Sequence, residues 1–222
     1  MLSNLDCIIF PDRCEVIEIV PSQRYVYPIF KNGSSSLFVA AKQHGWAIRL
    51  NQQIKKIAEI QVVLRDPQSR LVSGINTFIQ QTMRDHPSLD RKTVIWFAKN
   101  YLYLNRHYAP QFSWLVNLAR YMNSDTTIKF ITMQDLDSIT ELHKKPSGVE
   151  EVNPEILQEI GNIENLEMYQ RLDQVLVDYC IGQVMTFEHI LRLLNTQDSA
   201  AYDWVIGRSQ RILSPTHALS AT

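Results

Sequence analysis

Cysteine, glycine and an excess of either charge are all scarce in this chain. Its 222 residues include three cysteines and seven glycines, and 22 Lys and Arg nearly balance 23 Asp and Glu. The cysteines form no CxxC pair and no Cys/His cluster at zinc spacing, which argues against a zinc domain. Cys7 and Cys14 could pair only if their loop brought them together, so we expect buried free thiols and a reducing compartment. The balanced charge argues against a protein that works mainly on nucleic acid.

Long apolar runs are absent too. No stretch approaches the roughly 20 residues that a membrane span needs. The N-terminal segment carries Asp6 and Pro11 around a short apolar run, which is not the pattern of a signal peptide. We therefore expect a soluble, cytoplasmic protein without a membrane span. Its 45% hydrophobic and 20% charged residues are an ordinary globular composition, and the length suits one domain.

Short apolar runs and polar turns alternate along the first half of the chain. Runs at 5–10, 16–20 and 25–30 predict strands, and the third leads into a polar loop at 31–36. A nearly continuous apolar run at 60–64 predicts a buried parallel strand. The loop at 31–36 and a second polar turn, which begins at Arg65 after this strand, are each followed by a helical pattern. Strand, turn and helix in alternation predict an open α/β sheet. The second helix carries Leu71, Val72, Ile75 and Phe78 at helical spacing.

The rest of the chain predicts one more strand and several helices. An aromatic-rich segment at 92–122 mainly fills a core, and one or two of its rings could stack on a ligand. We expect a single domain over residues 1–222, with a central, mainly parallel sheet flanked by helices in 1–145 and a helical part in 146–222. The further elements expected are a strand at 128–133, a loop at 144–148 and helices at 134–143, 154–177, 186–194 and 200–212.

The first polar turn has the chemistry of an anion site. In sheets of this kind ligands bind at the carboxyl ends of strands, where both turns fall. Gly33 lets the backbone approach a ligand closely, and residues 34–36 are serines at the opening of a helix, whose partial positive charge suits a phosphate. Lys31 adds a mobile cation, but it precedes the glycine, so the GxxxxGK[ST] loop of ATPases is absent. A Ser-rich turn with an ordinary helix N-cap is the alternative interpretation.

The second polar turn follows the strand at 60–64. Pro67 suits the first turn of a helix, and Arg65 at the strand end can bind a phosphate with two parallel hydrogen bonds. Ser73 lies two helical turns further on and can donate its hydroxyl. The alternative here is an ion pair between Arg65 and Asp66, with Arg70 on the surface.

Taken together, the two turns resemble the nucleotide motifs of the sulfotransferases that use 3′-phosphoadenosine 5′-phosphosulfate (PAPS). PIFKNGSSSL at 28–37 resembles the loop PKxGT[TS]SL that holds the 5′-phosphosulfate, with Phe30 where the family has Pro. RDPQSRLVS at 65–73 resembles the motif RxPxxRLxS that holds the 3′-phosphate, in which Arg70 would help to fix the turn. The residues that the resemblance assigns to the donor are Lys31, Asn32, Gly33, Ser34, Ser35, Ser36, Leu37, Arg65, Arg70 and Ser73.

Two later segments extend the resemblance to roughly residues 25–140. NRHYAPQ at 105–111 is similar to the H[WF]xPQ segment of the carbohydrate sulfotransferases and their bacterial and viral relatives, and IKFITMQDL at 128–136 places Asp135 near an acidic position of that branch. The resemblance implies a P-loop-NTPase-like sulfotransferase fold and transfer of a sulfuryl group from PAPS to a hydroxyl or amine, with PAP (3′-phosphoadenosine 5′-phosphate) as product and no metal. A carbohydrate or small-molecule acceptor and a homodimer are compatible with it, and nucleic acid is not an expected partner.

Sulfuryl transfer requires a stabilised leaving phosphate and a base. Lys31 would neutralise the charge of the departing oxygen, and His107 in the HYAPQ segment is the first candidate for the base, with His86 as the second. Glu59 precedes its strand and is expected to face away. Two other interpretations stay open: a catalytically silent nucleotide-binding protein on the same fold, and a small-molecule kinase, which the absent Walker A lysine disfavours.

Overall fold

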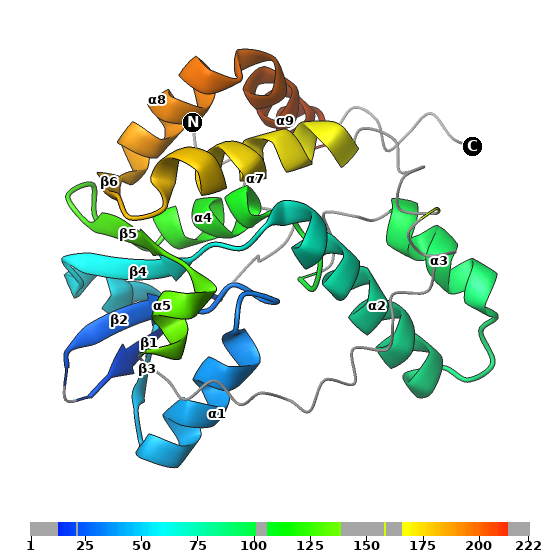
Figure 1. Ribbon diagram of the computed structural model, residues 1–222, viewed down its shortest axis with the longest axis horizontal. Coiled ribbons are helices and arrows are strands. Elements are labelled where there is room, and N and C mark those ends of the chain that lie inside the picture. The colour runs from blue at the N-terminus through cyan, green and yellow to red at the C-terminus, as the bar shows by residue number, and fades with distance from the viewer. Residues whose placement is uncertain (1–12, 21, 101–105, 139–157, 159–165, 213–222) are drawn as a thin grey trace.

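The computed structural model describes residues 13–20, 22–100, 106–138, 158 and 166–212 (Figure 1). Three predicted elements lie wholly or partly outside the described residues. They are the strand at 5–10, the loop at 144–148 and the helix at 154–177, of which 158 and 166–177 are described. In the described part a central sheet is covered by helices on both faces, as the sequence predicts for an α/β protein.

The sheet is mixed, with parallel strands at its centre. Six strands lie in the order β3-β1-β2-β4-β5-β6, and β2, β4 and β5 are parallel neighbours. Strand β1 runs antiparallel to β2 and β3, and β6 runs antiparallel to β5, so four of the six strands point the same way. The strands are β1 (Glu15–Ile19), β2 (Arg24–Tyr27), β3 (Ala47–Leu50), β4 (Glu59–Val63), β5 (Thr127–Ile131) and β6 (Val184–Thr186).

Alternating side chains along the strands feed two apolar cores. In β1, Val16 packs in the larger core and Ile17 in the smaller one, and β4 divides Val62 and Val63 in the same way. The larger core lies under α4, α7, α8 and α9, and the smaller core under α1 and α5, on the opposite side of the sheet (Figure 1). The helices are α1 (Ser34–His44), α2 (Pro67–Asp85), α3 (Arg91–Asn100), α4 (Gln111–Ala119), α5 (Met133–Asp137), α7 (Leu166–Cys180), α8 (Phe187–Gln197) and α9 (Ser199–Ile212), with a 3-10 turn η2 (Asn51–Lys56).

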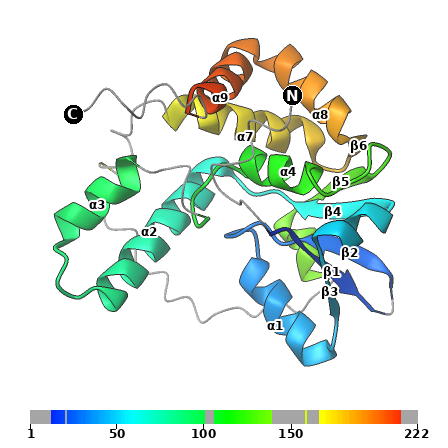
Figure 2. The same ribbon diagram turned by 180° about the vertical axis from the view of Figure 1, so that it is seen from behind.

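Helix α2 begins directly after the second polar turn. Pro67 is its first residue, and the carboxylate of Asp66 accepts a hydrogen bond from the Ser69 N–H at 2.7 Å, which caps the helix. The buried face of α2 includes Leu71 and Ile75. Figure 2 shows α2 and α3 as a helical hairpin beside the sheet, and α1 lies to the right of α2 in that view. The hairpin therefore places one long face of α2 opposite the start of α1.

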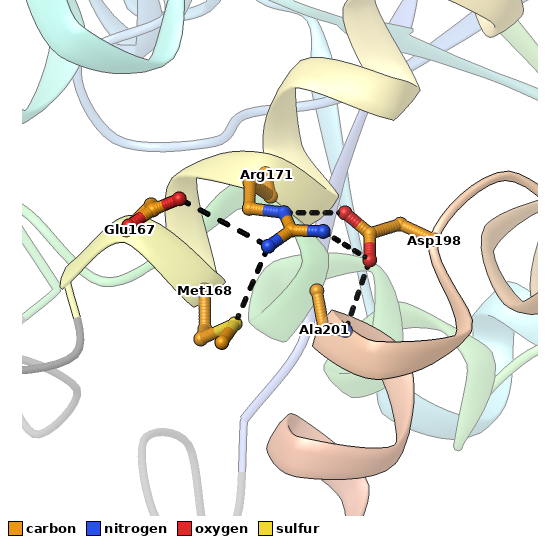
Figure 3. Close-up of polar contacts among 5 residues, drawn as sticks. All are labelled: Glu167, Met168, Arg171, Asp198 and Ala201. Carbon is orange, nitrogen blue, oxygen red and sulfur yellow. Dashed lines mark hydrogen bonds and ion pairs between the residues drawn. The ribbon is translucent and has the colours of Figure 1, made fainter.

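The C-terminal helices pack together on one face of the sheet. Arg171 of α7 binds Asp198 with two hydrogen bonds, of 2.6 and 2.8 Å, and Asp198 also accepts the Ala201 N–H of α9 at 3.0 Å (Figure 3). Cys14 and Cys180 are buried free thiols, as the sequence predicts. Among the described helices, none combines the length and the apolar character needed to cross a bilayer.

Candidate functional site

Two residues of the first polar turn adopt the left-handed backbone conformation. Lys31 has φ +70° and Gly33 has φ +82°, and a Cβ on Gly33 would lie 2.5 Å from the Leu136 Cδ2. Helix α1 begins at Ser34, so the three serines at 34–36 form its first turn. Its N-cap is Gly33, which offers no side-chain cap, and its first turn holds no acidic residue. The N–H groups of this turn therefore keep the partial positive charge of a helix N-terminus.

Asn32 faces the protein interior. It is fully buried, and its Nδ2 donates to the Val63 carbonyl at 2.7 Å and to Gln111 Oε1 at 2.6 Å. Asn32 therefore ties the first turn to the end of β4. The resemblance assigned this residue to the donor, but in the structure its side chain is used to hold the loop.

Gln111 links the two polar turns. Its Oε1 accepts from Asn32 and from the Arg65 N–H at 3.0 Å, and its Nε2 donates to the Arg65 carbonyl at 2.9 Å. Gln111 is fully buried at the start of α4. A third segment of the chain thus joins the ends of β2 and β4. The sequence offered no signal for this role beyond the place of Gln111 in the HYAPQ segment.

The Arg65 side chain lies against the first turn. Its Nη1 donates to the Lys31 carbonyl at 3.0 Å, and partial burial lowers the pKa of the guanidinium from its ordinary value. The two turns therefore meet at one edge of the sheet, as predicted from their positions after two parallel strands. The charge of Asp66 also acts on Arg65, as the alternative interpretation expected of this pair, and raises the pKa of the guanidinium against the effect of burial.

Arg70 and Asp173 are two buried charged residues behind the site. Arg70 is 1% exposed and its Nη1 donates to the Ala109 carbonyl, so the alternative interpretation of Arg70 as a surface residue is wrong. Asp173 of α7 accepts the N–H groups of Gln111 at 2.7 Å and Phe112 at 2.9 Å, and so caps α4 from another helix. Burial raises the pKa of Asp173 to about 6, although Arg70 acts in the opposite direction. Arg70 and Asp173 therefore each hold part of the segment 109–112 in place.

A cavity of about 480 Å³ opens between α1 and α2. The Lys31 ammonium donates to the Thr77 hydroxyl on its α2 side. Among the described residues that line it are the cations Lys31 and Arg84 and no carboxylate, so its charge suits an anion. Within the described residues, no three His, Cys, Asp or Glu side chains are grouped as a metal site. The lining residues are Phe30, Lys31, Gly33, Ser34, Ser35, Phe38, Thr77, Gln80, Gln81, Arg84 and His107.

His107 lines this cavity beside Lys31. Its ring packs on Phe30 with centroids 5.6 Å apart, and burial, followed by the charge of Lys31, lowers its pKa from the ordinary value. Gly74 of α2 sets the position of this residue, because a Cβ on Gly74 would lie 2.2 Å from the His107 carbonyl oxygen. Gly74 was not among the residues predicted for the site, although a glycine in the middle of a helix is a signal of close packing.

Other predicted residues lie away from the cavity. Among the described residues, Ser36, Arg65, Ser73 and His86 do not line it, and His86 is an exposed residue that ends α2. Leu37 packs in the smaller core, and its N–H donates to the Gly33 carbonyl at 3.1 Å. Glu59 is exposed at the start of β4, at the end opposite to the two turns. Asp135 caps α5 by accepting the Thr132 N–H at 2.8 Å.

Comparisons with known proteins found no relative of this chain. No protein-family model matches it, and neither a curated protein nor a solved structure does.

Proposed function

We propose that this protein binds PAPS at the two turns and transfers its sulfuryl group to a hydroxyl or amine acceptor in the cavity. One observation carries the proposal: Gln111 and the hydrogen bond from Arg65 to the Lys31 carbonyl join two turns that each have the chemistry of a phosphate site. The resemblance of both turns to sulfotransferase motifs supports the same conclusion. A single nucleotide with phosphates at both its 3′ and 5′ positions would use both turns at once.

Each turn would hold one end of the nucleotide. The N–H groups at the start of α1 and the Lys31 ammonium would bind the 5′-phosphosulfate, because a helix N-terminus attracts anions. The Arg65 guanidinium would bind the 3′-phosphate with charge-assisted hydrogen bonds, and the Ser73 hydroxyl would donate to it. Asn32, Gln111 and Arg70 would act through the backbone they hold.

The reaction needs a base and a group that stabilises the leaving phosphate. The acceptor oxygen would attack sulfur in line, the bond from sulfur to the 5′-phosphate oxygen would break, and PAP would leave with the electron pair. The acceptor proton would pass to the imidazole of His107, whose lowered pKa keeps it neutral at pH 7. Lys31 lines the same cavity and would stabilise the negative charge that develops on the departing oxygen.

Calorimetric titration with PAP, AMP and ATP tests the donor site. We expect metal-independent binding that prefers PAP, because only PAP places one phosphate at each turn. Lys31→Met and Arg65→Ala should each weaken PAP binding at least tenfold. Lys56→Met and Arg24→Ala are matched controls, since both residues are exposed and neither belongs to one of the two turns. Binding of ATP as tight as PAP and dependent on Mg²⁺ would contradict the proposal and favour a kinase.

A transfer assay separates an enzyme from a silent nucleotide-binding protein. Conversion of PAPS to PAP is followed by chromatography in the presence of a panel of sugars, phenols and alcohols. We expect acceptor-dependent PAP formation that falls about 100-fold or more in His107→Asn, with PAP affinity retained. PAP binding without acceptor-dependent turnover for the whole panel would support the silent protein instead.

A further inference from the structure

The cavity has a polar wall that the two turns do not account for. Thr77, Gln80, Gln81 and Arg84 of α2 all line it, and their spacing of three, four and seven residues from Thr77 places them along one stripe of the helix. The apolar residues of α2, such as Ile75 and Ile79, are buried on the opposite face. The α2 stripe (Thr77, Gln80, Gln81 and Arg84) thus forms one continuous polar side of the cavity.

The α2 stripe starts at the proposed reaction point and leads away from it. Its first residue, Thr77, accepts the hydrogen bond of the Lys31 ammonium. Arg84 lies seven residues further along α2, which is about 10 Å along the helix axis at about 1.5 Å per residue. A molecule the size of a disaccharide, with its reacting hydroxyl beside Lys31 and His107, would therefore extend as far as Arg84.

The side chains along the α2 stripe suit a hydroxyl-rich molecule with an anionic end. Gln80 and Gln81 carry amides, which both donate to and accept from hydroxyl groups. A guanidinium can bind carboxylate, sulfate or phosphate. The ion pair of Arg84 with Asp85 uses Nε, at 2.8 Å on the exposed surface. Phe38 of α1 lines the same cavity and offers a flat apolar surface for the C–H face of a sugar ring.

We propose that the α2 stripe binds the acceptor, and that the acceptor is a hydroxyl-rich molecule of about disaccharide size whose far end carries an anionic group that pairs with Arg84. This inference rests on the proposed function, because the position of the reacting hydroxyl is set by Lys31 and His107. It adds a substrate class to that function and assigns Gln81 and Arg84 as specificity-determining residues.

The test uses two disaccharides that differ in one group. Cellobiouronic acid carries a carboxylate where cellobiose carries the hydroxymethyl group of its non-reducing glucose ring. Both are titrated calorimetrically into the PAP-saturated protein. We expect cellobiouronic acid to bind five- to tenfold more tightly, and we expect this preference to fall with added salt. Arg84→Gln should abolish the preference, whereas the matched control Arg24→Gln should keep it, because Arg24 is an exposed arginine outside the cavity lining.

The outcomes separate the acceptor inference from the proposed function. PAP binding is measured first on the same samples. Where PAP binds, equal affinity for the two sugars, binding of neither, or a preference that survives Arg84→Gln would overturn the acceptor inference alone. Failure of PAP to bind would overturn the proposed function, and the sugars are then titrated without nucleotide. A carboxylate preference lost in Arg84→Gln would in that case support the α2 stripe as an anionic-sugar site.

Discussion

Two polar clusters hold this protein together in contrasting ways. The cluster around Gln111 is buried and joins three segments beside the candidate site. The pair of Arg171 and Asp198 joins the C-terminal helices, and the Arg171 side chain is 41% exposed (Figure 3). Water can replace a lost partner in the second cluster but not in the first. The contrast teaches that the costly polar contacts of the described structure are concentrated where the two turns must meet.

The largest effect is expected from removing the buried amide. Gln111→Ala leaves the Asn32 amide and the backbone groups of Arg65 without their partner, at about 1–3 kcal/mol for each unsatisfied buried group. We expect the free energy of unfolding to fall by about 3 kcal/mol or more in urea denaturation, and PAP affinity to fall at least tenfold. Gln53→Ala is the control, since Gln53 is exposed and its hydrogen bond to the Leu50 N–H is local. Equal losses of stability and PAP affinity in Gln111→Ala and Gln53→Ala would contradict the distinction between buried and exposed polar contacts.

The next effect concerns the close approach of α2 to His107. Helix propensity alone predicts that Gly74→Ala stabilises α2 by about 1 kcal/mol. The added Cβ would lie 2.2 Å from the His107 carbonyl oxygen. Destabilisation by overpacking should therefore exceed the gain in helix propensity, and the free energy of unfolding should fall by about 2 kcal/mol. Thermal or urea unfolding gives the sign directly. A stabilised variant would show that α2 does not hold His107 in this way.

A pH series tests the buried carboxylate of Asp173. Its folded pKa of about 6 lies above the ordinary value of 3.8, so the folded state binds a proton more readily than the unfolded state. The stability linked to this group is therefore present below pH 4 and is lost as the pH rises through about 6, by about 3 kcal/mol. Asp173→Asn should lack this slope in urea unfolding between pH 4 and pH 7. A stability that rises with pH relative to Asp173→Asn would mean that the N–H groups and Arg70 dominate over burial.

The smallest effect is expected at the exposed ion pair. Arg171→Ala should cost at most about 1 kcal/mol and should leave PAP affinity unchanged. Asp198→Ala should cost more than Arg171→Ala, because Asp198 also caps α9 through the Ala201 N–H. Urea unfolding at low and high salt measures both. A loss at Arg171 as large as that at Gln111 would remove the distinction between the two clusters.

The fold could be predicted from local patterns to a large extent. Apolar runs and Pro or Gly punctuation identified β1, β2, β4, β5 and the starts of α1 and α2, because these features act over a few neighbouring residues. The short edge strands β3 and β6 were missed, since β3 is four residues long and carries Arg49, and β6 is three residues long. The described sheet is also more mixed than the expected, mainly parallel one, because β1 and β6 run antiparallel to their neighbours.

The candidate site was predictable only in part. The turns at 31–36 and 65–73 could be identified because Gly, Ser, Lys and Arg act there through local chemistry. The contact between Gln111 and Asp173 spans 62 residues, and the contact between Asn32 and Gln111 spans 79. No local pattern reports such pairings. For the same reason the cavity side of α2 came from the structure, since the sequence shows the helix but not what its polar face meets.

A crystal structure of the PAP complex tests the central claim most directly. The account predicts the 5′-phosphate at the N–H groups that open α1, near the Lys31 ammonium, and the 3′-phosphate at the Arg65 guanidinium, with the Gln111 amide still joining the two turns. PAP bound elsewhere on the protein, or bound with only one phosphate at these turns and the other in solvent, would contradict it.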